Sequence, residues 1–207
     1  ASMAKDHFGK GAGVLAAWLI AFMPAHVTHS TWALADHDAF VMLFISVGFM
    51  YWLRAVKYAG SARISKTTSP HPLSFVRAFH DVAANRQAAL ANAALAGVAF
   101  GIVSLGWKGF VVGPSILFLA YALQVALNMF RRRDSTTLSV MFLVMLTTTF
   151  LMGLPFYAHP QLNLVFDSTG LQPFLFIFGF TIAIAFVTTG FRDTVSYTHL
   201  RAHETSE

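Results

Sequence analysis

The sequence predicts an all-α protein, a polytopic helical bundle that crosses a membrane about six times. Of its 207 residues, 56% are hydrophobic and only 11% are charged, and the mean hydropathy is +0.60. Long apolar stretches recur along the whole chain and are separated by polar connections. About a quarter of the residues of a soluble domain are charged, so this composition favours an integral membrane protein.

Six apolar stretches are expected to form the transmembrane helices. The first would span with help from the residues up to 28, and the second is short for a bilayer of roughly 30 Å, so Arg54 and Lys57 are expected to snorkel. The third is rich in Ala and Gly, which permit close helix approach in lipid, and a tight hairpin at residues 106–109 joins it to the fourth. The six stretches are residues 11–24, 39–53, 87–107, 109–130, 138–156 and 173–190.

Residues 58–86 form the longest polar stretch, and its second half has a helical pattern. Leu73, Phe75, Val76 and Phe79 fall near one face of a helix. This pattern predicts either an amphipathic helix at the membrane surface or a plain extension of the helix that follows.

The basic residues indicate the orientation in the membrane. If the six helices alternate, every Lys and Arg before residue 195 except Lys108 falls on one side, and the positive-inside rule makes that side cytoplasmic. Asp36, Asp38 and the turn at Trp107 then face the extracytoplasmic side of the cell membrane. The net charge of +5 fits the anionic headgroups of the lipid bilayer, and no nucleic-acid partner is expected.

Both ends of the sequence carry features that set them apart. Residues 1–194 are expected to be a partial transmembrane domain, because the chain opens without an initiator methionine and without a signal peptide. Residues 195–207 read like the translation of a sequencing adapter, and we expect no functional role for them. The chain has no cysteine, which excludes disulfides and thiolate metal sites.

Acidic and imidazole groups gather between the first two apolar stretches, and this is where we expect the chemistry. Asp36 and Asp38 stand next to His37, with His29 seven residues before the first acid. Carboxylates beside a membrane need water, a partner or a cation. Asp38 either caps a helix that begins at Ala39 or joins Asp36 in a site for Mg²⁺ or Mn²⁺, to which a histidine nitrogen would add a preference for Mn²⁺.

Three motifs together resemble the catalytic subunits of the membrane oligosaccharyltransferases. Residues 24–38 resemble the segment in which a proline leads to an Arg-Ser/Thr pair and then to an acidic pair, here Asp36 and Asp38. Residues 105–110 (Leu-Gly-Trp-Lys-Gly-Phe) are similar to the family's Trp-Gly-Gly-Tyr hairpin, and residues 152–155 (Met-Gly-Leu-Pro) to a later helix end that contains proline. The resemblance covers residues 11–190 and implies part of a GT-C type transmembrane domain, of an archaeal kind.

The resemblance implies protein N-glycosylation. Family members transfer an oligosaccharide from a polyprenyl (dolichyl) phosphate or pyrophosphate to asparagine in an acceptor polypeptide with the sequon Asn-x-Ser/Thr. It implies that Asp36 and Asp38 are catalytic ligands of a divalent metal, Mn²⁺ or Mg²⁺, and that four residues bind substrate: His29, His37, Trp107 and Lys108. The chain lacks the family's first acidic loop and its Trp-Trp-Asp motif, so we expect the isolated fragment to be inactive.

Several departures and alternatives remain open. His29 stands where the family has arginine, and Lys108 replaces a hairpin glycine, either to meet phosphate or, more commonly, as a solvated turn residue. A transferase that uses another polyprenyl-phosphate sugar fits the same architecture. A transporter fits less well, because the central turns of the six stretches contain no Asp, Glu, Lys or Arg.

Overall fold

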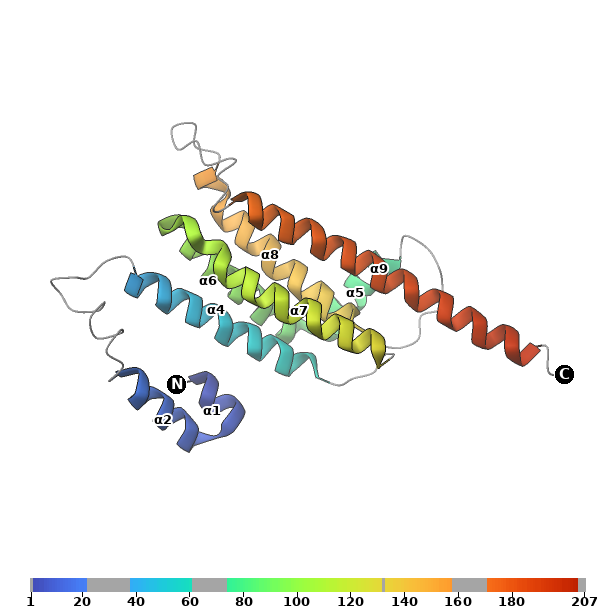
Figure 1. Cartoon of the computed structure of the whole chain (residues 1–207), viewed down its shortest axis with the longest axis horizontal. Coiled ribbons are helices and arrows are strands. Elements are labelled where there is room, and N and C mark those ends of the chain that lie inside the picture. Colours follow the sequence, from blue (N-terminus) through green and yellow to red (C-terminus); the bar gives the residue numbers. More distant parts are fainter. Residues whose placement is uncertain (1, 22–37, 61–73, 132, 158–170, 205–207) are drawn as a thin grey trace.

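The computed structural model describes residues 2–21, 38–60, 74–131, 133–157 and 171–204, and all regular structure in these segments is helical. A bundle of long helices runs in one direction in space, with the short N-terminal helices to one side (Figure 1). The elements in chain order are α1 (Ser2–Phe8), α2 (Lys10–Ala21), α4 (Asp38–Ala59), α5 (Ser74–Asn85), α6 (Gln87–Gly106), the 3₁₀ helix η2 (Lys108–Val111), α7 (Val112–Phe130), α8 (Thr136–Tyr157) and α9 (Leu171–Glu204).

Five helices are long and apolar enough to cross a membrane, and they correspond to the second to sixth predicted stretches. Their candidate spans are Ala39–Ala59, Gln87–Gly106, Gly109–Phe130, Thr136–Pro155 and Leu171–Thr188. The first predicted stretch is helical over Lys10–Ala21, and residues 22–24 lie outside the described part of the chain. The polytopic helical fold is therefore confirmed, with five full spans and one shorter apolar helix among the described residues.

α6 lies at the centre of the bundle and packs along α4 on one side and α8 on the other. Two glycines one turn apart make the α6–α8 contact close. A Cβ on Gly97 would lie 2.8 Å from the Cβ of Thr148 and would meet the backbone carbonyl of Met145, and a Cβ on Gly101 would meet the side chain of Met152. The prediction that the small residues of this span allow close helix approach is confirmed.

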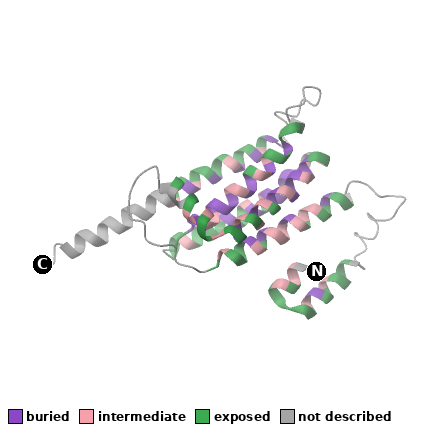
Figure 2. Ribbon diagram, turned by 180° about the vertical axis from the view of Figure 1, so that it is seen from behind, coloured by how far each residue is buried: buried purple, intermediate pink, exposed green. Residues whose placement is uncertain are grey.

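Phe100 fills the centre of the bundle from α6. Its ring is fully buried, and glycines on two other helices leave room for it. A Cβ on Gly48 of α4 would lie 2.7 Å from the ring, and one on Gly113 of α7 would lie 2.9 Å from its Cδ1. Figure 2 shows buried positions on the facing sides of the packed helices and exposed positions on their outer sides and ends.

α4 is longer than predicted. The expected stretch ended at residue 53, whereas the helix continues through Arg54 and Lys57 to Ala59. Arg54 and Lys57 therefore lie within the candidate span Ala39–Ala59, because Arg, Lys and Ala are good helix formers and a charge does not end a helix. Gly60 follows with φ 58°, the left-handed conformation typical of a glycine after a helix end, and the Arg86 guanidinium donates a hydrogen bond to the Ala59 carbonyl oxygen.

α1 is tied to α4 by an ion pair. Nε and Nη2 of Arg54 each lie 3.0 Å from Oδ2 of Asp6, and Nζ of Lys57 donates to the Asp6 carbonyl oxygen at 3.1 Å. The hydrogen bond and the positive charge of Arg54 lower the pKa of the Asp6 carboxyl below its ordinary value. This pair joins the N-terminal helices to the bundle at the end where α4 finishes.

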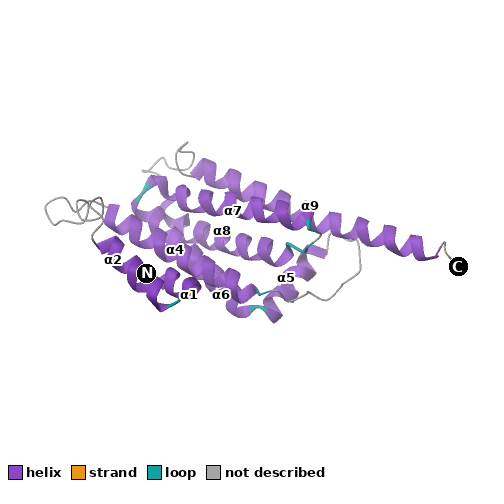
Figure 3. Cartoon of the chain, turned by 60° about the horizontal axis from the view of Figure 1, so that its bottom comes forward, coloured by secondary structure: helices purple, strands orange, loops and turns teal. Residues whose placement is uncertain are grey.

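The two ends of the bundle differ in character. The start of α4, the turn between α6 and α7, the end of α8 and the start of α9 lie at one end, which we call the hairpin end (Figures 1 and 3). The end of α4, the end of α7 and the start of α8 lie at the other, which we call the basic end. Lys57, Arg131 and Arg133 are exposed there. Asp134 accepts hydrogen bonds from the backbone N–H and the hydroxyl of Thr136, the first residue of α8.

Candidate functional site

The candidate site is the hairpin end, where the turn between α6 and α7 has a well-defined geometry. α6 ends at Gly106, and Trp107 is extended with φ −147° and ψ 126°. The Trp107 N–H donates to the Val103 carbonyl at 2.9 Å, and the Phe110 N–H donates to the Trp107 carbonyl at 3.2 Å. η2 then leads directly into α7, so the predicted tight hairpin between the third and fourth stretches is confirmed.

Two glycines shape this hairpin by leaving space for aromatic rings. A Cβ on Gly109 would lie 2.7 Å from Cε2 and Cη2 of Trp107, so the half-buried indole lies across the backbone of Gly109. A Cβ on Gly106 would lie 3.5 Å from Cε1 of Phe40 in α4, an ordinary contact distance. Aromatic rings therefore pack against both glycines of the turn.

The Phe40 contact places the beginning of α4 beside the hairpin. Phe40 is two residues after Asp38, the first residue of α4, and its ring also packs against Phe44 at a centroid distance of 4.8 Å. The helix begins one residue earlier than the Ala39 start that the capping interpretation of Asp38 assumed. An acidic residue in the first turn is favourable because the helix dipole is positive there.

The start of α9 closes the other side of the hairpin. Phe110 is buried, and its ring lies 5.6 Å from that of Phe174 between centroids. Leu171, the first residue of α9, is also buried in the same apolar core. Three separate helix starts, those of α4, α7 and α9, thus converge on one end of the bundle.

The predicted site residues are only partly within the described structure. His29, Asp36 and His37 lie outside the described residues, while Asp38 and Lys108 are placed by their backbone in α4 and η2. Trp107 is described in full. Among the described residues, which do not include Asp36, no group of three or more His, Asp or Glu side chains is placed to hold a metal ion.

Sequence reasoning did not identify Phe40 as part of this site. An apolar residue near the start of a membrane span gives no signal that separates it from a lipid-facing residue, and Phe40 is still 41% exposed. Only the packing of α4 against α6 reveals that it links the start of α4 to the hairpin. The glycines at 106 and 109 were visible as a turn signal but not as platforms for aromatic rings.

Comparison with known proteins gives the family. The family model described as oligosaccharyl transferase STT3, N-terminal, matches residues 2–198. No curated protein and no solved structure matches the chain. The family match includes all five candidate spans, the start of α4 and the hairpin. The chain therefore belongs to the oligosaccharyl transferase STT3 family of membrane glycosyltransferases, in whose N-terminal, membrane-embedded GT-C domain it lies.

Proposed function

We propose that the protein acts in N-glycosylation, transferring an oligosaccharide from a polyprenyl (dolichyl) phosphate or pyrophosphate to the asparagine of an Asn-x-Ser/Thr sequon. The match to the oligosaccharyl transferase family across the membrane domain supports this proposal most strongly. The contact between Phe40 and the hairpin also supports it, because it brings the chain directly after Asp36 and His37 to the end where the hairpin lies.

We assign the catalytic role to Asp36 and Asp38 as ligands of Mn²⁺ or Mg²⁺. Carboxylate oxygens are the donors that these hard cations prefer, and Asp38, the first residue of α4, is two residues from Asp36 in the sequence. When bound, the ion would neutralise charge on the departing lipid phosphate. Asp38, the first residue of α4, would hold the ion together with Asp36, and His29 and His37 are assigned to substrate binding.

Trp107 and Lys108 are assigned to the same substrate-binding surface. The Trp107 ring is held against Gly109, so it presents a fixed apolar plate at the hairpin end. Lys108 follows it at the first position of η2, and a lysine there adds a positive charge to the side that we predict, from the distribution of Lys and Arg, to face the extracytoplasmic surface of the cell membrane. A phosphate-bearing lipid donor needs both an apolar contact and a cationic group.

The proposal is tested in the membrane-embedded enzyme by changing Asp36 and, as a control, an acid of α5. Asp36→Ala is expected to abolish glycosylation of a reporter polypeptide that carries one Asn-x-Thr sequon, measured by mass spectrometry. Asp81→Ala is the matched control, because it removes the same charge from α5 at the basic end, and it is expected to leave transfer unchanged. Turnover by Asp36→Ala at the control rate would refute the assignment.

Asp38 and the metal need separate measurements. If Asp38 only begins α4, Asp38→Ala costs about 0.5–2 kcal/mol of folding free energy and turnover persists. As a ligand, it is required for transfer and for Mn²⁺ binding, which electron paramagnetic resonance detects without any substrate. Transfer that continues at the untreated rate after prolonged chelation by EDTA, and that does not increase when Mn²⁺ or Mg²⁺ is added, would contradict the metal assignment.

A further inference from the structure

α5 is a separate helix that lies across the basic end of the bundle. It ends at Asn85, and Arg86, with φ −134° and ψ 36°, interrupts the helical backbone before α6 begins at Gln87. The alternative that α5 is a plain extension of the next helix was therefore wrong. α5 packs against α6, α8 and α9, and it lies near the end where α4 and α7 finish (Figures 1 and 3).

The bundle covers only part of the apolar surface of α5. Val82 is buried, with 2% of its surface exposed, and it faces the spanning helices. Val76 and Phe79, three residues apart and therefore neighbours on the helix surface, are 61% and 43% exposed. At about 100° per residue, they form an apolar lobe on one flank of Val82, while Asp81 and Asn85 lie on its other flank.

The position of α5 sets the depth of this lobe. The candidate span of α6 begins at Gln87, two residues after α5 ends, and with that span across the membrane α5 would lie where the hydrocarbon layer gives way to headgroups. An apolar lobe held at that level meets lipid rather than bulk water. A short helix with one apolar face and one polar face is typical of a segment that lies in the membrane plane.

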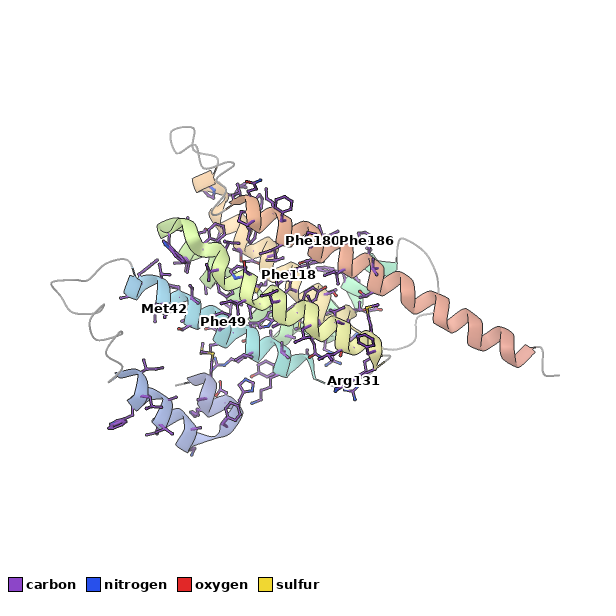
Figure 4. All side chains as sticks on the ribbon, in the orientation of Figure 1. Met42, Phe49, Phe118, Arg131, Phe180 and Phe186 are labelled. Atoms are coloured by element: carbon purple, nitrogen blue, oxygen red, sulfur yellow. The ribbon has the colours of Figure 1, made fainter. Side chains whose placement is uncertain are left out.

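The charges around α5 select the kind of lipid. Lys57, Arg131 and Arg133 are exposed at the basic end, and Arg131 lies at the end of α7 (Figure 4). Asp6 is paired with Arg54, whereas Asp134 keeps its negative charge while it accepts hydrogen bonds from Thr136. Among the described residues, the basic end still has more basic than acidic side chains: Arg54, Lys57, Arg86, Arg131 and Arg133 against Asp6, Asp81 and Asp134.

We propose that α5 is an in-plane membrane anchor that binds anionic phospholipid at the basic end. Val76 and Phe79 insert among the acyl chains at the level of the headgroups, and Arg131 and Arg133 bind the headgroup phosphates. The anchor fixes the basic end of α6, α8 and α9 at the membrane surface. It is independent of the chemistry proposed for the hairpin end, and it makes no use of Asp36 or Asp38.

The depth of α5 can be measured directly because the chain has no cysteine. Single cysteines at Val76, Phe79 and Asn85 are spin-labelled in the full chain, reconstituted in vesicles of phosphatidylcholine with about one third phosphatidylglycerol. We expect the labels at 76 and 79 to be accessible to oxygen and shielded from a water-soluble nickel complex, and the label at 85 to show the reverse. Nickel accessibility at 76 and 79 equal to that at 85 would overturn the anchor, as would shielding of both from oxygen and nickel, which indicates a protein partner.

The headgroup preference is tested with spin-labelled lipids. The wild-type chain is expected to restrict labelled phosphatidylglycerol more strongly than labelled phosphatidylcholine, and Arg131→Gln with Arg133→Gln to reduce this preference several-fold at low salt. Arg131→Lys with Arg133→Lys is the matched control, because it keeps both positive charges, and it should retain most of the preference. A preference that is the same in the double variant and the wild type would refute the role of the two arginines.

Discussion

The indole ring of Trp107 lies across the backbone of Gly109, at the place where any other residue would carry its Cβ. The hairpin between α6 and α7 therefore depends on the absence of a side chain at that position. The ring is held by packing against Gly109. The Trp107 backbone is also fixed, by its hydrogen bonds to Val103 and Phe110. An aromatic plate so fixed is suited to bind substrate with little loss of conformational entropy.

Gly109→Ala is expected to displace the Trp107 ring and to lower glycan transfer. The new methyl group would stand 2.7 Å from two ring carbons, so the ring must move, at a cost of about 1–3 kcal/mol in folding free energy. Gly106→Ala is the matched control in the same turn, because its Cβ would meet Phe40 at an ordinary 3.5 Å. Thermal unfolding and reporter glycosylation measure both effects, and equal behaviour of the two variants would contradict the role given to Gly109.

Gly97→Ala tests the close packing of α6 against α8. Its Cβ would meet the rigid backbone carbonyl of Met145, so the helices must separate, and we expect a loss of about 1–3 kcal/mol in the free energy of unfolding. Gly179→Ala in α9 is the control, because no atom lies within 4 Å of the added Cβ. Denaturation of the purified protein in detergent measures both, and a Gly97→Ala variant as stable as Gly179→Ala would show that the two helices are not in close contact.

The spanning helices could be predicted from the sequence because apolar length is a strong signal. The end of α4 could not, since Arg54 and Lys57 are charged yet remain helical, and Arg54 is paired with Asp6, 48 residues away in the sequence. The break at Arg86 also carries no distinctive residue type. In the candidate site, the turn glycines were visible, but the contact between Phe40 and Gly106 depends on how two helices pack, which no local pattern encodes.

The pair between Asp6 and Arg54 predicts a pH-dependent attachment of α1. The pKa of Asp6 is lowered in the folded protein, so the attachment is fully present above the ordinary carboxyl pKa of 3.8 and is lost as the pH falls through the lower folded value. Spin labels on cysteines at Phe8 and Tyr58, both exposed, report the separation of α1 from α4. We expect the distance distribution to broaden only below about pH 4.

Asp6→Asn serves as the comparison for this measurement. The amide cannot form the charged pair, so the broad distribution should appear already at pH 7 and change little on acidification. Lys10→Gln, at the exposed start of α2, should keep the wild-type profile. A wild-type distance that is constant to pH 2, or an Asp6→Asn variant with a narrow distribution at pH 7, would show that the pair does not hold α1.

Tyr121 and Ser139 share a buried hydrogen bond of 2.9 Å between α7 and α8, and the Tyr121 ring stacks on Phe142 at a centroid distance of 4.7 Å. Tyr121→Phe keeps the stacked ring and removes only the hydroxyl, so we expect a loss of about 0.5–1.5 kcal/mol in the free energy of unfolding. Ser139→Ala should cost a similar amount, and the double variant should cost less than the two losses added together. A double-mutant cycle on the purified protein measures this coupling. Strictly additive losses would mean that the two hydroxyls act independently and that the α7–α8 contact rests on ring packing alone.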